Sequence, residues 1–198
     1  VGNQIAQSLR KETEIHEIIA IGRNIHPPPS KLFEGLRYLS CDLSKDNLNY
    51  PWLKDVDTVF HVAAKAGVGG NYQEYFNANF LATKNLMEGC KSYGIQRFIY
   101  TSTPSVVFNN QNIRNGNESL PYLKAPISPY AFTKAKNLEL LENLKKWFKL
   151  KFEIIYFYNV YGENQIELGY MATVIGIFQS QYSKNKPLTV VKPGTQTR

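Results

Sequence analysis

Short apolar runs alternate with longer amphipathic stretches along the chain. The apolar runs are rich in β-branched and aromatic residues, as buried parallel strands are; they lie at residues 17–22, 36–39, 57–62, 97–102, 152–158 and 188–191. Apolar side chains at helical spacing predict helices at residues 5–9, 72–93, 129–150 and 170–182. This order is typical of βαβ units, so the sequence predicts an α/β protein with a doubly wound parallel sheet.

The composition is that of an ordinary globular protein. Hydrophobic residues make up 43% and charged residues 20%, which excludes a disordered or collagen-like chain. No apolar run approaches the ~20 residues of a membrane helix, and no signal-like segment opens the chain. We therefore expect a cytoplasmic protein with no membrane partner. The two cysteines, Cys41 and Cys90, lack metal-ligand spacing, so no metal site is expected.

The net charge of +7 makes nucleic acid the first partner to consider. The basic residues are dispersed, however. The densest group comes at the end of a predicted helix, where cations favour the helix dipole; it comprises Lys145, Lys146, Lys149 and Lys151. This pattern predicts a solvated surface and no nucleic-acid partner.

The strongest chemical signal is Tyr130 followed four residues later by Lys134 near the start of a predicted helix. Residues at this spacing share a helical face, and a neighbouring ammonium group lowers the pKa of a phenol. Tyr130 is thereby predicted to be a general acid/base. The hydroxyl-rich run 100–105 ends a predicted strand, at the sheet edge where α/β proteins bind ligands.

Together with these residues, several positions resemble the extended short-chain dehydrogenase/reductase family, of the NAD-dependent epimerase/dehydratase type. The segment 61–65 resembles its His-x-Ala-Ala turn, 42–43 its adenine-binding Asp-Leu pair, and Asn79 its helix asparagine that supports the active site. The resemblance implies a Rossmann-like fold, a homodimer formed through the two long helices, and a catalytic set of Thr103, Tyr130 and Lys134. It also implies cofactor contacts at Gly2, Arg23, Asp42, Leu43, Ala63, Ala64, Lys65, Asn79, Thr101, Ser102, Tyr130 and Lys134. His61 is interpreted as a core histidine rather than a catalytic one.

The resemblance is incomplete at both ends of the chain. Residues 1–4 resemble only the tail of the family's glycine-rich turn, with Gly2 as its last glycine, and residues 194–198 resemble the Gly-x-Gln-x-Arg of its substrate-binding segment. We therefore expect a fragment of a longer protein. Residues 1–158 would form a dinucleotide-binding domain without its first strand, and residues 159–198 the start of a substrate-binding region.

The residues that end the predicted strand 17–22, which corresponds to the family's second strand, indicate which dinucleotide binds. Gly22 stands where an acidic residue would bind the ribose 2′-hydroxyl of NAD, and Arg23 follows it. A planar guanidinium suits the 2′-phosphate of NADP, so the sequence favours NADP over NAD. Stacking of Arg23 on the adenine of either nucleotide is the alternative.

Two substrate classes are resembled by different parts of the chain. Residues 100–108 and 118–122 are similar to the 3β-hydroxysteroid dehydrogenase branch. From residue 152 onward the chain is similar instead to nucleotide-sugar epimerases and dehydratases, which implies substrate contacts from Thr103, Asn159 and Arg198. Tyr156 departs from this pattern, in which arginine is common, and so does Glu163, where proline is common.

Because substrate choice resides in the C-terminal part, the predicted function is that of an NAD(P)-dependent nucleotide-sugar epimerase or related dehydratase, acting through a keto-sugar intermediate. Pro104 and Ser105 follow the catalytic hydroxyl where a dehydratase usually carries Asp-Glu, which argues against dehydration. Oxidation of a sterol-like 3β-alcohol is the alternative. A non-catalytic dinucleotide-binding protein is a third hypothesis, which the retained Tyr130 and Lys134 disfavour.

Overall fold

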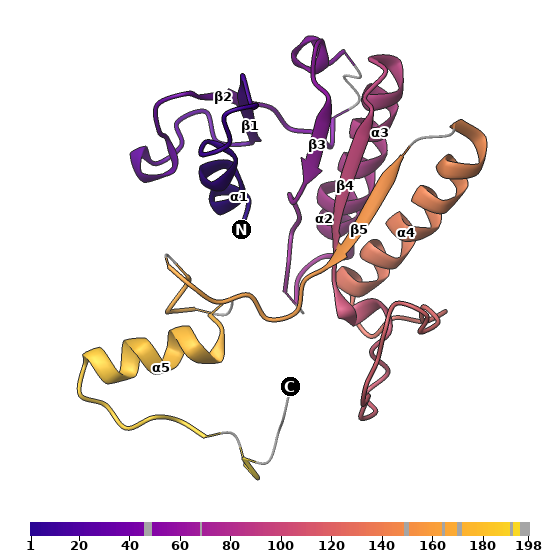
Figure 1. The fold of residues 1–198 in the computed structure, drawn as a ribbon. Coiled ribbons are helices and arrows are strands. Elements are labelled where there is room, and N and C mark those ends of the chain that lie inside the picture. Colours follow the sequence, from indigo (N-terminus) through magenta and orange to yellow (C-terminus); the bar gives the residue numbers. More distant parts are fainter. Residues whose placement is uncertain are drawn as a thin grey trace. The chain divides into compact units, whose positions relative to one another are not determined.

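The computed structural model describes residues 1–45, 49–67, 69–148, 151–163, 165–169, 172–190 and 192–194. The chain divides into two compact units, Val1–Phe157 and Tyr158–Arg198, and each is treated by itself. Among the described elements, all the strands and all the helices but one belong to the first unit, and the second carries helix α5 (Val174–Ser183), drawn in yellow in Figure 1.

The strands of the first unit form two parallel sheets. Strand β1 (Ile18–Gly22) pairs with β2 (Leu36–Ser40), while β4 (Arg97–Ser102) lies between β3 (Thr58–His61) and β5 (Phe152–Tyr156). The sequence predicts a single sheet, but among the described strands no hydrogen-bonded ladder joins β1 to β3. The α/β class and the parallel direction of the strands agree with the prediction.

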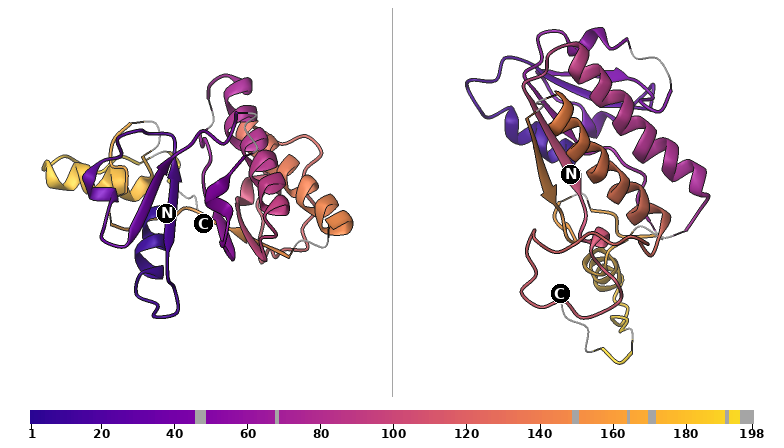
Figure 2. Two further views of the ribbon diagram at one scale, coloured as in Figure 1. Left: turned by 90° about the horizontal axis from the view of Figure 1, so that it is seen from above. Right: turned by 90° about the vertical axis from the view of Figure 1, so that its right-hand side faces the viewer.

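Helices cover one face of the three-stranded sheet. Helices α3 (Ala82–Ser92) and α4 (Pro129–Phe148) lie side by side on it in both views of Figure 2. Helix α1 (Gly2–Leu9) packs beside β1. Three short 3₁₀ turns begin at prolines, which fit the first turn because they lack an N–H group: Pro29–Lys31, Pro51–Leu53 and Pro104–Val106.

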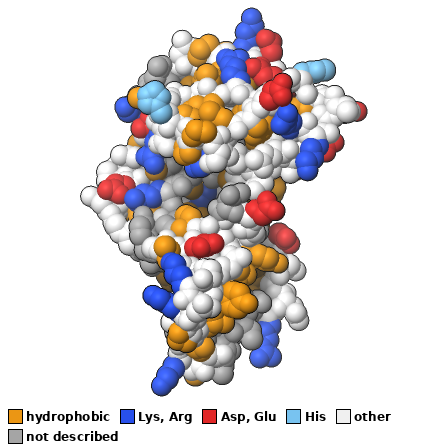
Figure 3. Space-filling view, turned by 90° about the vertical axis from the view of Figure 1, so that its left-hand side faces the viewer, with side chains coloured by type: hydrophobic (Ala, Val, Ile, Leu, Met, Phe, Trp, Pro, Cys, Tyr) orange, Lys and Arg blue, Asp and Glu red, His pale blue; other side chains and the backbone are white. Residues whose placement is uncertain are grey.

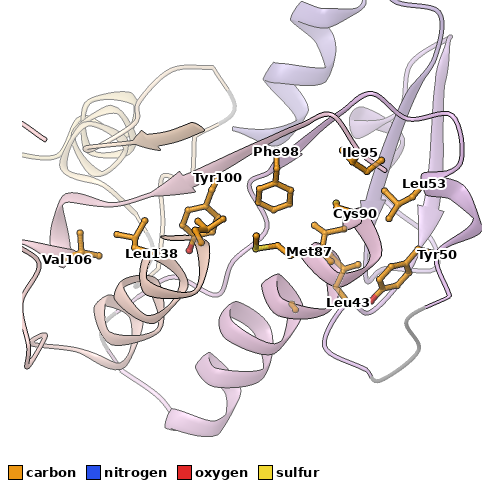
Figure 4. Close-up of a cluster of buried hydrophobic side chains, with 13 residues drawn as sticks. Leu43, Tyr50, Leu53, Met87, Cys90, Ile95, Phe98, Tyr100, Val106 and Leu138 are labelled. Carbon is orange, nitrogen blue, oxygen red and sulfur yellow. The ribbon is translucent and has the colours of Figure 1, made fainter. Parts of the chain in front are cut away.

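The hydrophobic core lies between β4 and the two long helices. Phe98 and Tyr100 project from β4 toward Met87 and Cys90 of α3 and Leu138 of α4, and all are fully or almost fully buried (Figure 4). Both cysteines are free thiols, and burial raises the pKa of Cys90 to about 12. The core therefore fixes the end of β4 against the start of α4, where the chemical signal lies.

The predicted helix 72–93 contains a turn of another kind. Helix α2 (Tyr72–Tyr75) continues into a π-helical segment, η3 (Phe76–Leu81), before α3 begins. A π-helical turn widens the helix by one residue and is frequent at functional sites. The apolar spacing predicts helix here but does not distinguish the wide turn, whose buried member is Asn79.

Some predicted boundaries differ from the structure. Helix α1 begins at Gly2, earlier than predicted, whereas β5 ends at Tyr156 and α5 begins at Val174. Residues 188–190 of the predicted last strand are not in a strand, and residue 191 lies outside the described part. These exposed residues have no neighbouring strand among the described residues of their own unit, and a strand needs a partner to pair with.

Within the described residues, none of the helices is both long and apolar enough to cross a lipid bilayer. On the face drawn in Figure 3, lysine and arginine side chains are interspersed with aspartate and glutamate rather than gathered into a stripe. On this face the basic side chains are thus dispersed, as they are along the sequence.

Candidate active site

The start of α4 is fixed by local hydrogen bonds. Ser128 precedes the helix; its hydroxyl accepts from the Ala131 N–H at 3.2 Å, and its main-chain oxygen accepts from the Phe132 N–H at 2.9 Å. Pro129 then occupies the first helical position, which it favours because its N–H is absent. This cap determines the direction in which the half-buried Tyr130 side chain leaves the first turn.

Thr103 lies at the end of β4 and meets Tyr130. Its hydroxyl caps the turn Pro104–Val106 by accepting from the Ser105 N–H at 3.3 Å, and the residue is 7% exposed. Burial raises the pKa of Tyr130, and a hydrogen bond with the Thr103 side chain partly offsets that rise. The structure thus brings together the hydroxyl and the phenol that the sequence predicts to act on one substrate oxygen.

Lys134 is almost entirely buried, at 2% exposure. Its Nζ donates to the main-chain oxygen of Thr101 at 2.7 Å and lies 4.7 Å from the centroid of the Tyr100 ring. Burial lowers the pKa of Lys134 to about 8. The prediction that the lysine lowers the pKa of Tyr130 is wrong for the protein alone, because burial outweighs other influences and the net shift is upward.

Asn79 connects the start of α4 to the turn after β3. Its Nδ2 donates to the main-chain oxygen of Lys65 and to the Thr133 hydroxyl, each at 3.0 Å, and its Oδ1 accepts from the Lys65 N–H at 2.7 Å. The wide turn of η3 carries this amide, which is 1% exposed. Asn79 therefore acts on the site through Lys65 and Thr133, as a positioning residue.

A second layer of buried polar side chains surrounds the hydroxyl of Tyr100, whose ring contacts Lys134. The Nδ2 of Asn137 donates to the main-chain oxygen of Asn79 at 3.0 Å and to the Tyr100 hydroxyl at 2.8 Å, with the Thr83 hydroxyl oxygen 3.1 Å away. Sequence reasoning did not identify Asn137, Thr83 or Tyr100. The spacing gives a signal for two of them, because Asn137 follows Lys134 by three residues and Thr83 follows Asn79 by four.

His61 belongs to this layer and agrees with its interpretation as a core residue. It is 2% exposed, and its Nε2 lies 2.8 Å from the Thr83 hydroxyl oxygen. Because that hydroxyl donates to the main-chain oxygen of Asn79, it is left to accept, which assigns the histidine proton to Nε2. Burial, with a contribution from the nearby Lys134 charge, lowers the pKa of His61 to about 3.

A cavity of about 200 Å³ opens between the ends of β1, β2 and β3. Six of the predicted cofactor contacts line it, with Ile21, Gly22, Cys41, Ala78 and Ala82: these are Arg23, Asp42, Leu43, Ala63, Ala64 and Lys65. The Asp42 carboxylate accepts from the Ser44 hydroxyl at 2.7 Å and from its N–H at 3.1 Å, and the pKa of Asp42 is lowered, chiefly by the hydroxyl. The glycine and alanines in this lining leave room for a flat ring, and Arg23 supplies a guanidinium beside it. This lining fits the adenosine part of a dinucleotide.

The remaining predicted contacts are distributed as follows. Thr101, Ser102, Tyr130 and Lys134 lie around the end of β4 and the start of α4, and Asn79 reaches the cavity through the main chain of Lys65. Gly2 is the first residue of α1. Asn159 is exposed in the second unit, and Arg198 lies outside the described residues. No cluster of metal-ligating side chains occurs among the residues that the structure describes.

Comparison with known sequences gives one family over the whole chain. Residues 1–198 match the NAD dependent epimerase/dehydratase family. An uncharacterized UDP-glucose epimerase of Bacillus subtilis (strain 168) is 31% identical over 212 aligned residues, covering 100% of this chain and 64% of that protein. The human sterol-4-alpha-carboxylate 3-dehydrogenase (decarboxylating) is 41% identical over 99 residues, covering 50% of this chain and 26% of that enzyme.

Solved structures give the same fold. The Bacillus cereus UDP-glucuronic acid 4-epimerase in complex with NAD superposes with a TM-score of 0.83 at 28% identity, covering 99% of this chain and 64% of that one. The Rossmann-like fold class predicted from the sequence is confirmed by this likeness. The chain spans less than two thirds of the length of each of these proteins.

Proposed function

The chain belongs to the NAD-dependent epimerase/dehydratase family, and we propose that the whole protein is a nucleotide-sugar epimerase that works through a keto-sugar intermediate. The observation that carries this proposal is the meeting of Thr103 and Tyr130 at the end of β4, the strand whose Thr101 main-chain oxygen holds the buried ammonium of Lys134. A proton acceptor, a second hydroxyl and a fixed cation are the groups that oxidation of a sugar alcohol requires.

The roles follow from the surroundings of each group. Tyr130 takes the proton of the substrate hydroxyl as its C–H bond breaks, and Thr103 holds the same oxygen by a hydrogen bond. A bound nicotinamide supplies the hydride acceptor for that step. When the keto sugar is reduced again from its other face, Tyr130 would return the proton to the same oxygen, so that the carbon is inverted with no net oxidation.

Lys134 serves this chemistry through its charge and its fixed position. Its ammonium is held by the Thr101 carbonyl and the Tyr100 ring, so it needs little reorganisation when a ribose hydroxyl or a phenolate arrives. Binding of an anionic dinucleotide beside Lys134 favours its charged form. We expect the pKa of Tyr130 to fall only then, because in the protein alone burial dominates.

The extent of the sequence matches favours a sugar substrate. The epimerase relative aligns with 100% of the chain, whereas the sterol dehydrogenase aligns with 50%. The C-terminal part, which carries the proposed nucleotide-diphosphate ligands Asn159 and Arg198, is thus matched by the sugar enzyme. The higher local identity of the sterol enzyme, 41%, keeps oxidation of a 3β-alcohol as the second candidate.

For the cofactor we propose NADP, on the basis of Arg23 in the lining of the cavity and of Gly22 at the position of the usual acid. NAD is the alternative, since it is the dinucleotide bound in the Bacillus cereus epimerase.

The substrate class is tested by thermal denaturation of the whole protein. We expect UDP and UDP-glucose to raise the melting temperature, and we expect Arg198→Ala to remove that rise because it deletes a proposed diphosphate ligand. A 3β-hydroxysteroid serves as the comparison ligand. Stabilisation by the steroid and not by UDP would overturn the sugar substrate in favour of the sterol alcohol.

A further inference from the structure

The side chain of Tyr38 fills the space above Gly22. A Cβ atom built on Gly22 would press against the Tyr38 hydroxyl oxygen and lie 3.2 and 3.3 Å from Cζ and Cε2 of the ring. These ring distances are shorter than ordinary carbon–carbon contacts. Position 22 therefore has no room for a side chain while Tyr38 keeps its orientation.

That orientation is held by a hydrogen bond. The Tyr38 hydroxyl donates to the main-chain oxygen of Asn24 at 2.9 Å. Two residues along β2, the Ser40 hydroxyl donates to the main-chain oxygen of Arg23 at 3.3 Å. Tyr38 and Ser40 project from the same face of the strand, since alternate residues share a face. Together they pin the turn that follows β1 and that carries Arg23.

Arg23 lines the cavity from this pinned turn. Its side chain is exposed and forms no ion pair with any described carboxylate. Its positive charge lies near enough to Asp42 to contribute to the lowered pKa of that carboxyl. The guanidinium is thus available to an anionic group that enters the cavity.

From these contacts we propose that Tyr38 is a specificity-determining residue for the dinucleotide, although it does not line the cavity itself. Its ring occupies the space that a side chain at position 22 would need, so an acidic residue at that position could not reach the adenosine ribose. Its bond to Asn24 also holds the turn that presents Arg23 to a phosphate on that ribose. The role rests on the proposed function, because it presupposes that a dinucleotide binds in this cavity.

The effect of a substitution at position 22 on dinucleotide binding should therefore depend on the residue at position 38. An aspartate at position 22 would displace the Tyr38 ring, break its bond to Asn24 and release the Arg23 turn. Gly22→Asp alone should therefore weaken binding of both dinucleotides instead of creating a preference for NAD. Only after Tyr38 is shortened can the new carboxylate reach a ribose hydroxyl.

The test measures the dissociation constants of NADPH and NADH for the whole protein by nicotinamide fluorescence. Wild type, Gly22→Asp, Tyr38→Ala and the double variant are compared. Tyr38→Phe is the intermediate variant: it removes the hydroxyl, and with it the bond to Asn24 and the closest contact with position 22, but keeps the ring. We expect the double variant to bind NADH about tenfold more tightly than Gly22→Asp does, with the preference for NADPH reversed. Tyr38→Phe combined with Gly22→Asp should show a smaller gain, because the ring carbons remain 3.2 and 3.3 Å from the Cβ position.

A stability measurement without nucleotide accompanies it. Gly22→Ala should lower the melting temperature when Tyr38 is present and have little effect in the Tyr38→Ala background. Equal gains in NADH affinity for Gly22→Asp and the double variant would overturn the role of Tyr38 while leaving the proposed function intact. If the wild type binds neither nucleotide, the proposed function and this role both fail.

Discussion

The Nδ2 atom of Asn137 lies 2.8 Å from the hydroxyl oxygen of Tyr100, and the ring of this tyrosine lies 4.7 Å from the Nζ atom of Lys134. The Tyr100 ring thus supports the Lys134 ammonium. The Tyr100 hydroxyl accepts from Asn137, which lies one turn beyond Lys134 in α4. Asn137 also donates to Asn79 O, so α4, β4 and η3 all contribute to the support of the lysine.

Removal of the Tyr100 hydroxyl should lower stability while the ring remains. We expect Tyr100→Phe to reduce the free energy of unfolding by about 1–2 kcal/mol, because Asn137 loses a buried partner. Asn137→Ala should lower it by about 2–4 kcal/mol, since it also leaves the Asn79 carbonyl without this donor. Urea denaturation of the single and double variants gives a coupling energy of about 1 kcal/mol if the bond exists. Strictly additive effects would speak against it.

The buried charge of Lys134 should lower the free energy of unfolding. Its pKa is lowered from 10.5 to about 8 by burial, so the folded state disfavours the ammonium. Lys134→Met should then raise the free energy of unfolding at neutral pH by about 1–3 kcal/mol. The difference should shrink as pH rises from about 8 to 10.5, because there the folded lysine has lost its proton while the unfolded lysine still holds it, so stability rises with pH. A variant that is less stable than wild type at neutral pH would contradict this account.

His61 should make the fold sensitive to acid. The pKa of His61 in the folded protein, about 3, lies below the ordinary 6.5. The unfolded chain therefore takes up a proton that the folded protein refuses, and the free energy of unfolding decreases as pH falls from 6.5 toward 3. The loss should amount to roughly 3–5 kcal/mol for this group. His61→Gln, which can still bond Thr83, should flatten the acid limb of the stability curve. His16→Gln is the matched control, because His16 is exposed, and an equal flattening there would exclude the assignment.

The hydroxyls of Tyr122 and Tyr156 lie 2.5 Å apart and tie the segment after Val107 to the end of β5. Nearby, the Leu123 N–H donates to the main-chain oxygen of Val106 at 2.9 Å. Tyr156→Phe should therefore speed hydrogen exchange of the Leu123 amide by about 5–10-fold, the equivalent of one lost hydrogen bond. Tyr161→Phe, which alters an exposed tyrosine of the second unit, should leave that rate unchanged. Identical exchange in all three proteins would mean that the pair does not hold the segment.

Much of the fold follows from local sequence pattern. The runs around Ile19, Phe60 and Ile154 are strands because their apolar, β-branched character fits a buried sheet, and the Tyr130–Lys134 spacing gives a shared helical face wherever a helix forms. The meeting of Thr103 with Tyr130 could be anticipated because strand ends and helix starts share one edge of a parallel sheet.

Other features depend on tertiary packing and could not be predicted in this way. The π-helical turn at Asn79 has no signature in apolar spacing, since it differs from an α-helical turn by a single residue. The bond from Asn137 to Tyr100 joins residues 37 positions apart, and the contact of Tyr38 with Gly22 depends on strand pairing. The upward pKa shift of Tyr130 likewise depends on burial, which a spacing argument does not measure.

The central claim is that Tyr130 transfers the proton while the sugar is oxidised and reduced again. The most direct test follows interconversion of UDP-glucose and its C4 epimer by NMR with the whole protein and with Tyr130→Phe, each saturated with dinucleotide. The account predicts that the variant binds the dinucleotide as the wild type does but loses turnover by about a hundredfold or more. Unchanged turnover in Tyr130→Phe would contradict it.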